Sequence, residues 1–467
     1  MDRMKYAGGA PGAVVKNLGW QGAALAVLMA CFATIPAAHG ADGRDALFED
    51  DDPLPKAKSE KKTGGVTGYI QLEAARTVSS PDHWSKLRAR GELASRGDLG
   101  GGIRYKLSAR ADYDAVYDIN DFYPQPVRHD QRFDFALREN YLDISRGDWD
   151  FRLGRQHVVW GEMVGLFFAD VVSARDLREF ILPEFEALRT PQWAARAEYY
   201  KDDFHAEFLW VPVATYDKIG KPGAEFYPYQ PDLTGRVTYL HEKRPKADWD
   251  HMNYGVRLSA LLSGWDLSGF AYSSMDVQPT FHRSISLTPP VPTVPTVIYQ
   301  ARHERIRQFG GTLAKDIDGV VFKMEAVHTH GRKYPVLRFM DADGLAEQNT
   351  VDWAAGLDFT LPADTRFNVQ FFQRIYTNHD RDSLQDREEN GYSLYLNTKI
   401  IPAIESQVTY IASLNRSSWL ARPRVLWNFQ KNWRLLVGAD VFGGKPTGLF
   451  GQYDERDRVY TEVRYTF

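Results

Sequence analysis

Polar and apolar residues alternate strictly along much of the chain. Between residues 103 and 115, Arg104, Lys106 and Arg110 fall on one face of an extended chain, while Leu107 and Tyr113 fall on the other. A period of two over that length predicts a β-strand with one wet face and one apolar face. The same pattern predicts strands in the segments 86–93, 193–200, 254–261, 322–326, 353–360, 366–371, 392–399 and 459–467.

The connections between these segments alternate between short and long. Short connections are expected at 145–148, 201–203, 263–265, 316–319, 362–365, 401–404 and 431–433. Long ones are expected at 121–130, 161–191, 217–250, 283–297, 333–349, 378–388 and 443–457. Tight periplasmic turns and longer external loops are typical of transmembrane barrels. The pattern therefore predicts an all-β, antiparallel, up-and-down barrel of about 18 strands.

Two alternatives to this architecture remain open. The count could be 16, because the segment 415–433 is ambiguous. A soluble β-sandwich would also produce alternation. No apolar run after residue 40 approaches the eighteen or so residues of a transmembrane helix, and the mean hydropathy is −0.43. A barrel whose alternate residues face lipid accounts for both observations, and for the 13% aromatic content.

The first residues predict export. Arg3, Lys5 and Lys16 precede an apolar run, and the small residues before Ala41 suit cleavage there, so residues 1–40 are expected to be a signal peptide. A lipoprotein signal ending at Cys31 is the alternative. Residues 41–64 are expected to be a disordered periplasmic tail, and residues 65–467 the barrel. Loss of residues 1–40 removes the single cysteine and changes the formal net charge from −4 to −6, which argues against nucleic-acid binding.

The long connection at 161–191 is unusual because it mixes apolar residues with charges of both signs. Phe167, Phe168, Leu177, Ile181 and Phe185 could anchor it to a wall while its charged side stays wet. By position it is the third external loop, and we expect it to fold into the lumen and constrict the pore; an external loop on the barrel rim is the alternative. The expected constriction residues are Asp170, Arg175, Asp176, Arg178, Glu179, Glu184, Glu186 and Arg189.

The second and third predicted strands carry a row of cations, here called the basic ladder. Its members are Lys86, Arg88, Arg90, Arg104, Lys106 and Arg110. If the wet face lines the pore, the loop carboxylates would face this ladder, and the two rows would set up a transverse field that sorts solutes by charge. The alternative is a solvated lumen wall whose charges neutralise one another.

The chain ends in an alternating strand that carries Val463, Tyr465 and Phe467 on one face. A terminal aromatic residue on such a strand resembles the assembly signal of Gram-negative outer-membrane barrels, although an ordinary edge strand could also end in this way. The stretches RLGRQHVVWG (152–161), DKIGKPGAEFYP (217–228) and 457–467 resemble a family of proteobacterial outer-membrane barrels. That family is classified only as a domain of unknown function and is similar in architecture to porins and alginate exporters. The resemblance implies fold and location in the bacterial outer membrane, and hardly bears on substrate.

Motifs for catalysis are missing from the sequence. It contains no Gly-x-Ser-x-Gly, no His-Glu-x-x-His and no Gly-rich phosphate loop, and His157 with Glu162, or His328 with His330 on a lipid-side face, lack further ligands or partners. We therefore expect no enzyme, no catalytic residues, no metal and no cofactor. The expected partners are outer-membrane lipid and lipopolysaccharide, the barrel-assembly machinery and a possible periplasmic transport partner.

The predicted function is a passive channel for small hydrophilic or amphiphilic solutes. Two other functions stay open: a substrate-selective exporter or importer of a lipid or polysaccharide, and a structural or adhesive surface barrel whose Pro-rich segment 289–295 would make contacts.

Overall fold

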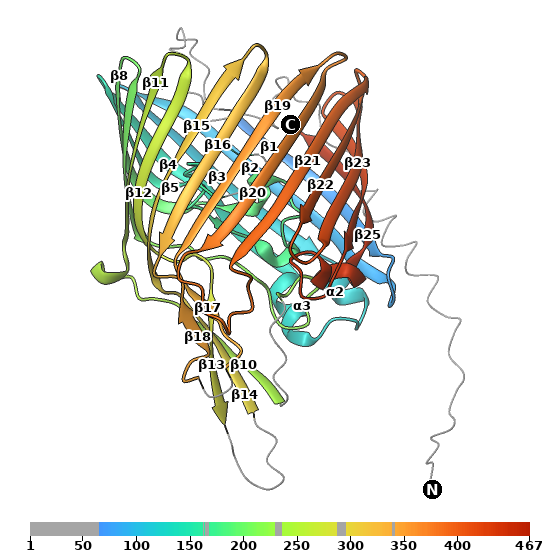
Figure 1. Cartoon of the computed structure of the whole chain (residues 1–467). Helices are drawn as coiled ribbons and strands as arrows, with labels where there is room; N and C mark the ends of the chain where they lie inside the picture. The colour runs from blue at the N-terminus through green and yellow to red at the C-terminus, as the bar shows by residue number, and fades with distance from the viewer. Residues whose placement is uncertain (1–64, 162, 164–167, 229–235, 287–295, 339–340) are drawn as a thin grey trace, which may run out of the picture. The chain divides into compact units, whose positions relative to one another are not determined.

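Eighteen antiparallel strands form one closed sheet in the computed structural model, which describes residues 65–161, 163, 168–228, 236–286, 296–338 and 341–467 (Figure 1). Each strand pairs with the next along the chain, and the last strand, β25, pairs with β1 from Tyr69 to Thr77, so the sheet has no free edge. The predicted all-β up-and-down barrel is confirmed, with 18 strands rather than 16. The predicted signal peptide and tail, residues 1–64, lie outside the described residues.

The barrel strands keep the alternation that predicted them, and every segment predicted as a strand overlaps an observed one. They are β1 (Val66–Thr77), β2 (His83–Gly100), β3 (Ile103–Asp114), β4 (Phe133–Arg146), β5 (Trp149–Gln156), β8 (Gln192–Lys201), β9 (Phe204–Val213), β11 (Asn253–Leu262), β12 (Trp265–Met275), β15 (Arg305–Ile317), β16 (Val320–His330), β19 (Thr350–Leu361), β20 (Thr365–Tyr376), β21 (Glu388–Ile401), β22 (Ile404–Ser413), β23 (Ser418–Gln430), β24 (Trp433–Gly443) and β25 (Arg458–Thr466).

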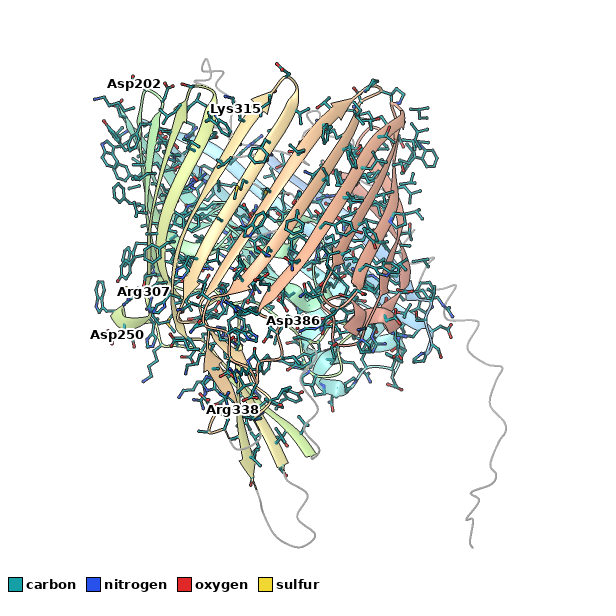
Figure 2. All side chains as sticks on the ribbon, viewed as in Figure 1. Asp202, Asp250, Arg307, Lys315, Arg338 and Asp386 are labelled. Carbon is teal, nitrogen blue, oxygen red and sulfur yellow. The ribbon has the colours of Figure 1, made fainter. Side chains whose placement is uncertain are left out.

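Tight turns close the hairpins at one end of the barrel. The turn between β11 and β12 consists of Ser263 and Gly264, both with positive φ (53° and 78°), which matches the right-handed twist of the flanking strands. Because Tyr69 pairs with Thr466, β1 begins and β25 ends at this same end. Figure 2 places Asp202 and Lys315 at this end, and Asp250, Arg307 and Asp386 at the other.

The connections at the opposite, external end are not all long, although an alternation of short and long connections was predicted. Two of them, 78–82 and 414–417, are only five and four residues long. The second of these explains why the segment 415–433 was ambiguous: β22, β23 and β24 follow one another with tight connections on both sides.

The long loops after β9 and β12 contain a second sheet that the alternation did not separate from barrel strands or loops. It consists of β10 (Arg236–Lys243), β14 (Thr296–Arg302) and β13 (Thr280–Ser286), with β10 parallel to β14. The loop after β16 adds the hairpin β17 (Lys333–Pro335) and β18 (Leu345–Glu347). Both extend from the barrel end opposite the tight turns (Figure 1).

The outer face of the barrel is apolar. Phe133, Phe135 and Leu137 alternate along β4 with exposures of 59%, 60% and 45%. Aromatic side chains gather near both strand ends, for example Trp433 and Tyr465 near the tight turns and Tyr254 and Trp210 toward the external end. A closed barrel with an apolar band between aromatic girdles is suited to a membrane. Among the described residues, no helix is both long and apolar enough to cross a membrane.

The terminal strand carries a prediction about assembly. Tyr465 lies opposite Trp433 on β24 and opposite Ile70 on β1, with its ring centroid 4.8 Å from that of Trp433. Deleting residues 465–467, or changing Phe467→Asp, is expected to leave export intact and to reduce barrel insertion strongly, because the apolar end of the closing strand is lost. Heat-modifiable migration of outer-membrane fractions measures insertion.

The change Leu449→Asp, at an exposed apolar residue of the external loop before β25, is the control and should insert normally. Normal insertion of both terminal variants would show that the last residues are not an assembly signal.

Candidate functional site

The lumen of the barrel is crossed by the third external loop, residues 157–191, here called the lumen loop. Its short elements are β6 (Ala174–Arg175), η1 (Leu177–Glu179), α4 (Phe185–Leu188) and β7 (Arg189–Thr190). The loop contacts inward side chains of strands around most of the barrel, from β2 and β4 to β9, β16, β23, β24 and β25. The expectation that this loop folds into the lumen therefore agrees with its contacts.

One end of the lumen loop packs against the wall formed by β8, β9, β12 and β16. Trp160 is fully buried there, and its indole N–H donates a hydrogen bond of 3.1 Å to Glu207. Gly255 on β11 makes room for this ring, because a Cβ at that position would lie 2.6 Å from it. The shared apolar cluster contains Val158, Trp160, Ala169, Val171, Val172, Ala194, Leu209, Val211, Phe270, Tyr272 and Val327.

The middle of the lumen loop packs against the opposite wall. Leu182 is buried against inward residues of β22, β23 and β24, and its carbonyl oxygen accepts a hydrogen bond of 2.6 Å from Arg422. Phe180 and the predicted anchor Ile181 pack against the same cluster. The other predicted anchors differ: Phe168 lies near Phe372 of β20, with centroids 6.0 Å apart. Phe185 lies under the Arg189 guanidinium, Leu177 is half-buried in η1, and Phe167 lies outside the described residues.

Glu179 fixes the loop to the basic ladder. Its carboxylate forms ion pairs with Lys86, with Arg88 at 2.6 Å and with Arg458 of β25 at 3.4 Å. Burial alone would raise the pKa of Glu179, but the charges of Arg88, Lys86 and Arg458 outweigh burial and hold that pKa well below its ordinary value. The same two ladder cations also pair with Glu73 of β1, so Glu73 and Glu179 together neutralise them.

The other expected constriction residues form separate ion pairs. Asp170 pairs with Arg189 at 2.9 Å and with Arg175 at 3.9 Å, Asp176 pairs with Arg178 at 2.6 Å, and Glu184 pairs with Arg434 at 3.4 Å. Of the loop carboxylates that the structure describes, only that of Glu179 lies within ion-pair distance of the basic ladder. Burial, then the charge of Glu184, raises the pKa of Glu186. The sequence predicted two facing rows of charge. In the described residues, the loop and the basic ladder form ion pairs at one loop carboxylate, that of Glu179.

The remaining members of the basic ladder differ in how well they are neutralised. Arg90 forms two hydrogen bonds with Asp112, at 2.7 and 2.9 Å, and Lys106 pairs with Glu139. Arg104 is half-buried on the same side of β3. Arg110 is 4% exposed, and its nearest carboxylate oxygen is the Asp112 Oδ2, at 3.4 Å. A role for these residues in lining a conducting pore stays a prediction.

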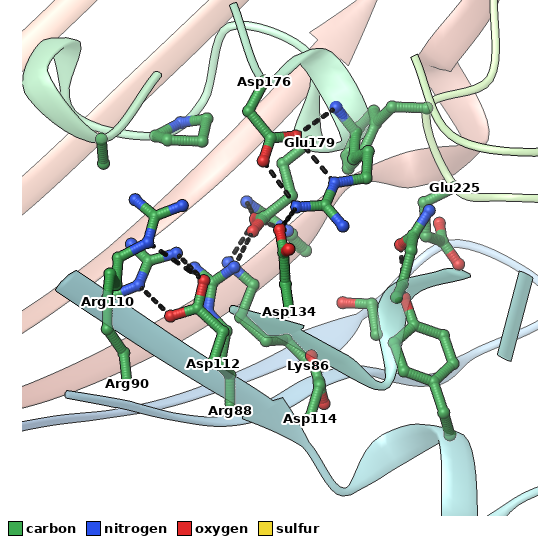
Figure 3. A pocket seen from close by; sticks show the side chains of 18 residues that line it. Lys86, Arg88, Arg90, Arg110, Asp112, Asp114, Asp134, Asp176, Glu179 and Glu225 are labelled. Carbon is green, nitrogen blue, oxygen red and sulfur yellow. Dashed lines mark hydrogen bonds and ion pairs between the residues drawn. The ribbon is translucent and has the colours of Figure 1, made fainter. Parts of the chain in front are cut away.

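A cavity of about 60 Å³ remains between β2, β3 and the lumen loop (Figure 3). Its wall is rich in charge, with Arg88, Arg90, Arg110, Asp112 and Glu179 among the lining residues. The same cavity is bordered by Pro183 and Ala187 of the loop, so the loop and the ladder enclose it together.

Three further external loops help to fill this end of the lumen: those after β3 and after β9, and the one before β25. This was not predicted from the sequence. The loop after β3 contains α2 (Val116–Ile119) and α3 (Gln125–Gln131), and Tyr117, Tyr123 and Ala224 form one cluster there. The loop before β25 contains η3 (Gly451–Arg456), whose Tyr453 hydroxyl donates to the Phe226 carbonyl at 3.2 Å. The available signal in the sequence was the aromatic residues of these loops, such as Tyr117, Phe226 and Tyr453, because loops that lie in solvent do not need them.

Metal ligands do not gather anywhere in the described part of the chain in groups of three or more. His328 lies on β16 opposite Phe309 of β15, which is 53% exposed on the outer face. His157, at the start of the lumen loop, has its pKa lowered by burial and by the charges of Arg138 and Arg189. The imidazole is therefore neutral at physiological pH.

Comparison with known proteins adds a family and a fold. The family model described as "Protein of unknown function (DUF1302)" matches residues 82–338, more than half of the chain. No curated protein matches the sequence. Similar solved structures include OccAB1 of Acinetobacter baumannii (TM-score 0.53, 8% identity, 88% of this chain and 98% of that one) and OccAB4 of the same organism (TM-score 0.51, 9% identity, 87% and 99%).

A third similar structure is OccK8 (OprE) of Pseudomonas aeruginosa, with a TM-score of 0.50 and 8% identity over 86% of this chain and 98% of that one. These likenesses concern the fold. With the apolar exterior of the closed barrel, they agree with the predicted location, and the chain is a β-barrel of the bacterial outer membrane.

Proposed function

Because the chain belongs to the family described as "Protein of unknown function (DUF1302)", whose description assigns no activity, we propose from its structure that it is an outer-membrane channel for small hydrophilic or amphiphilic solutes. The observation that carries the proposal is the charged inner wall of an 18-strand barrel, across which one loop is fixed by ion pairs. Barrels of this size enclose an aqueous channel, and an inserted loop narrows and filters it.

Single-channel recording in planar lipid bilayers tests the proposal. The purified full-length barrel is expected to give ohmic current steps in KCl. Bilayers that contain folded, heat-modifiable protein and stay silent would contradict it.

The second candidate is a selective transporter of an amphiphilic substrate such as a lipid, working with a periplasmic partner. The apolar clusters inside the lumen, which contain Phe270 and Phe442, favour it, because an amphiphile needs apolar surface along its path. Liposome flux assays separate the two candidates, because a selective transporter would pass the amphiphile and exclude a sugar of similar size.

The basic ladder carries a prediction about charge selectivity. Changing Arg88, Arg90, Arg104 and Arg110 together to Gln is expected to shift the zero-current potential in a KCl gradient toward cation preference. Four positive charges are lost, and Glu73, Asp112 and Glu179 each lose a neutralising partner. The shift should be largest at low salt, where the screening length exceeds about 10 Å.

Four arginines on external loops provide the matched control. They are Arg244, Arg338, Arg381 and Arg387. Changing these four to Gln removes the same charge outside the lumen and should leave the potential nearly unchanged. Equal shifts in the two quadruple variants would mean that the ladder does not line the conduction path.

A further inference from the structure

Arg110 is a buried cation whose charge the protein does not fully neutralise. Its side chain is 4% exposed, and its Nη1 nitrogen is buried with no hydrogen-bond partner. Among the described residues, the one carboxylate within ion-pair distance is that of Asp112, which is already held by two hydrogen bonds from Arg90. An arginine keeps its charge in proteins, so a buried guanidinium with an unused donor is costly unless a ligand or water occupies that side.

A second buried guanidinium lies on the neighbouring strand. In the pairing of β3 with β4, Arg110 lies opposite Ala136, and Arg138 follows two residues further along β4. Arg138 is 6% exposed and donates to the carbonyl oxygens of Arg189 and Glu186, at 2.9 and 2.5 Å. These acceptors are neutral, and no carboxylate of the described residues lies within ion-pair distance of Arg138. The two guanidiniums therefore create a local excess of positive charge.

The nearby loop carboxylate relieves this excess only in part. Asp176 accepts hydrogen bonds from the Arg178 Nε and Nη2 atoms, at 2.8 and 2.6 Å, and is neutralised by that residue. In Figure 3 the outer nitrogens of Arg110 are directed away from Asp112. Arg110 lines the cavity of about 60 Å³ together with Pro183 and Ala187, and that volume holds a few waters or one small anion.

We propose that Arg110, supported by the charge of Arg138, forms a binding site for a small carboxylate between β3 and the lumen loop. The planar guanidinium fork matches the two oxygens of a carboxylate, and the resulting hydrogen bonds are charge-assisted. The inference deepens the proposed channel function, because it names carboxylates as the class of solute that this part of the lumen recognises.

Binding of acetate to the full-length protein in detergent micelles tests the site without any need for conduction. Saturation-transfer NMR of the acetate methyl group, at constant ionic strength set with sodium chloride, is expected to show a saturable signal. The change Arg110→Gln should weaken binding by about tenfold or more, because the guanidinium that the carboxylate would contact is lost. Arg96→Gln, on the neighbouring strand β2 and not among the residues that line the cavity, is the matched control and should bind as the unchanged protein does.

A second variant keeps every charge and tests the cavity instead. Ala187→Met fills the space beside Arg110 and should abolish the saturable signal while heat-modifiable migration shows a folded barrel. No saturable signal from the unchanged protein, or equal signals from Arg110→Gln and Arg96→Gln, would overturn the site. Acetate binding by a barrel that stays silent in bilayers would leave the site standing and overturn the channel function alone.

Discussion

Replacing residues 164–188 with a Gly/Ser linker is expected to raise single-channel conductance by at least about threefold, because the segment that crosses the lumen is removed while the strands that form the wall remain. The lumen loop contacts inward residues on opposite walls, so it occupies the cross-section rather than one side of it. The measurement is the current step in planar bilayers at high salt, where wall charges are screened.

The barrel is expected to survive this replacement. Lys86 and Arg88 keep Glu73 as a partner, and Arg458 keeps Asp440 at 2.9 Å, so no ladder cation that pairs with the loop is left without a carboxylate. Folding is checked by heat-modifiable migration before conductance is compared.

The matched control removes a segment of another external loop, the one between β16 and β19. Replacing residues 333–347, which contain β17 and β18, shortens a loop at the barrel's external end and should leave conductance unchanged. A folded variant without residues 164–188 that conducts as the unchanged protein does would show that the lumen loop does not limit the current.

The wall of the barrel was predictable because each of its residues faces one of two environments. Lipid on one side and the lumen on the other impose a period of two, and that period survives in the sequence of β3 or β25 without any knowledge of the neighbouring strand. The sheet of β10, β13 and β14 was missed for the same reason. A short strand outside the barrel shows the same alternation, and the parallel pairing of β10 with β14 joins residues about sixty positions apart.

The lumen was harder to predict because its contacts join distant parts of the chain. Glu179 and Arg458 are 279 residues apart, and no local pattern relates them. A row of cations also gives the same alternation whether water or a carboxylate faces it. One pairing could have been found: the turn after β2 sets a register that places Arg90 opposite Asp112, and that register follows from the glycines at 100–102.

The ion pairs of Glu179 predict that this residue holds the lumen loop in its inserted position. We call this interaction the latch. The change Glu179→Gln keeps the size of the side chain and removes its charge, so Lys86, Arg88 and Arg458 lose a shared partner. Each of the three cations keeps a second carboxylate, so the cost is that of the lost charge-assisted hydrogen bonds, about 2 kcal/mol. If that cost falls on the inserted position of the loop, the ratio of open to constricted channels rises by about thirtyfold.

The change Glu184→Gln is the matched control on the same loop. Glu184 is 31% exposed and lies 3.4 and 3.9 Å from Arg434 and Arg464, so its loss should cost less than about 1 kcal/mol and alter gating little. Long single-channel recordings measure the fraction of time in the high-conductance state. Equal open fractions in the Glu179→Gln and Glu184→Gln variants would contradict a latch at Glu179.

The lowered pKa of Glu179 gives the latch a definite response to pH. A carboxyl whose pKa is lower in the folded protein stabilises the folded arrangement above its ordinary pKa, and this stabilisation is lost as the pH falls toward the lowered value. Glu179 therefore stays charged between pH 8 and pH 5, and the unchanged channel should keep the same open fraction across that range. The Glu179→Gln channel should be open more often at every pH in the range, since it lacks the charge throughout. An open fraction of the unchanged channel that climbs between pH 7 and pH 5 would contradict a latch at Glu179.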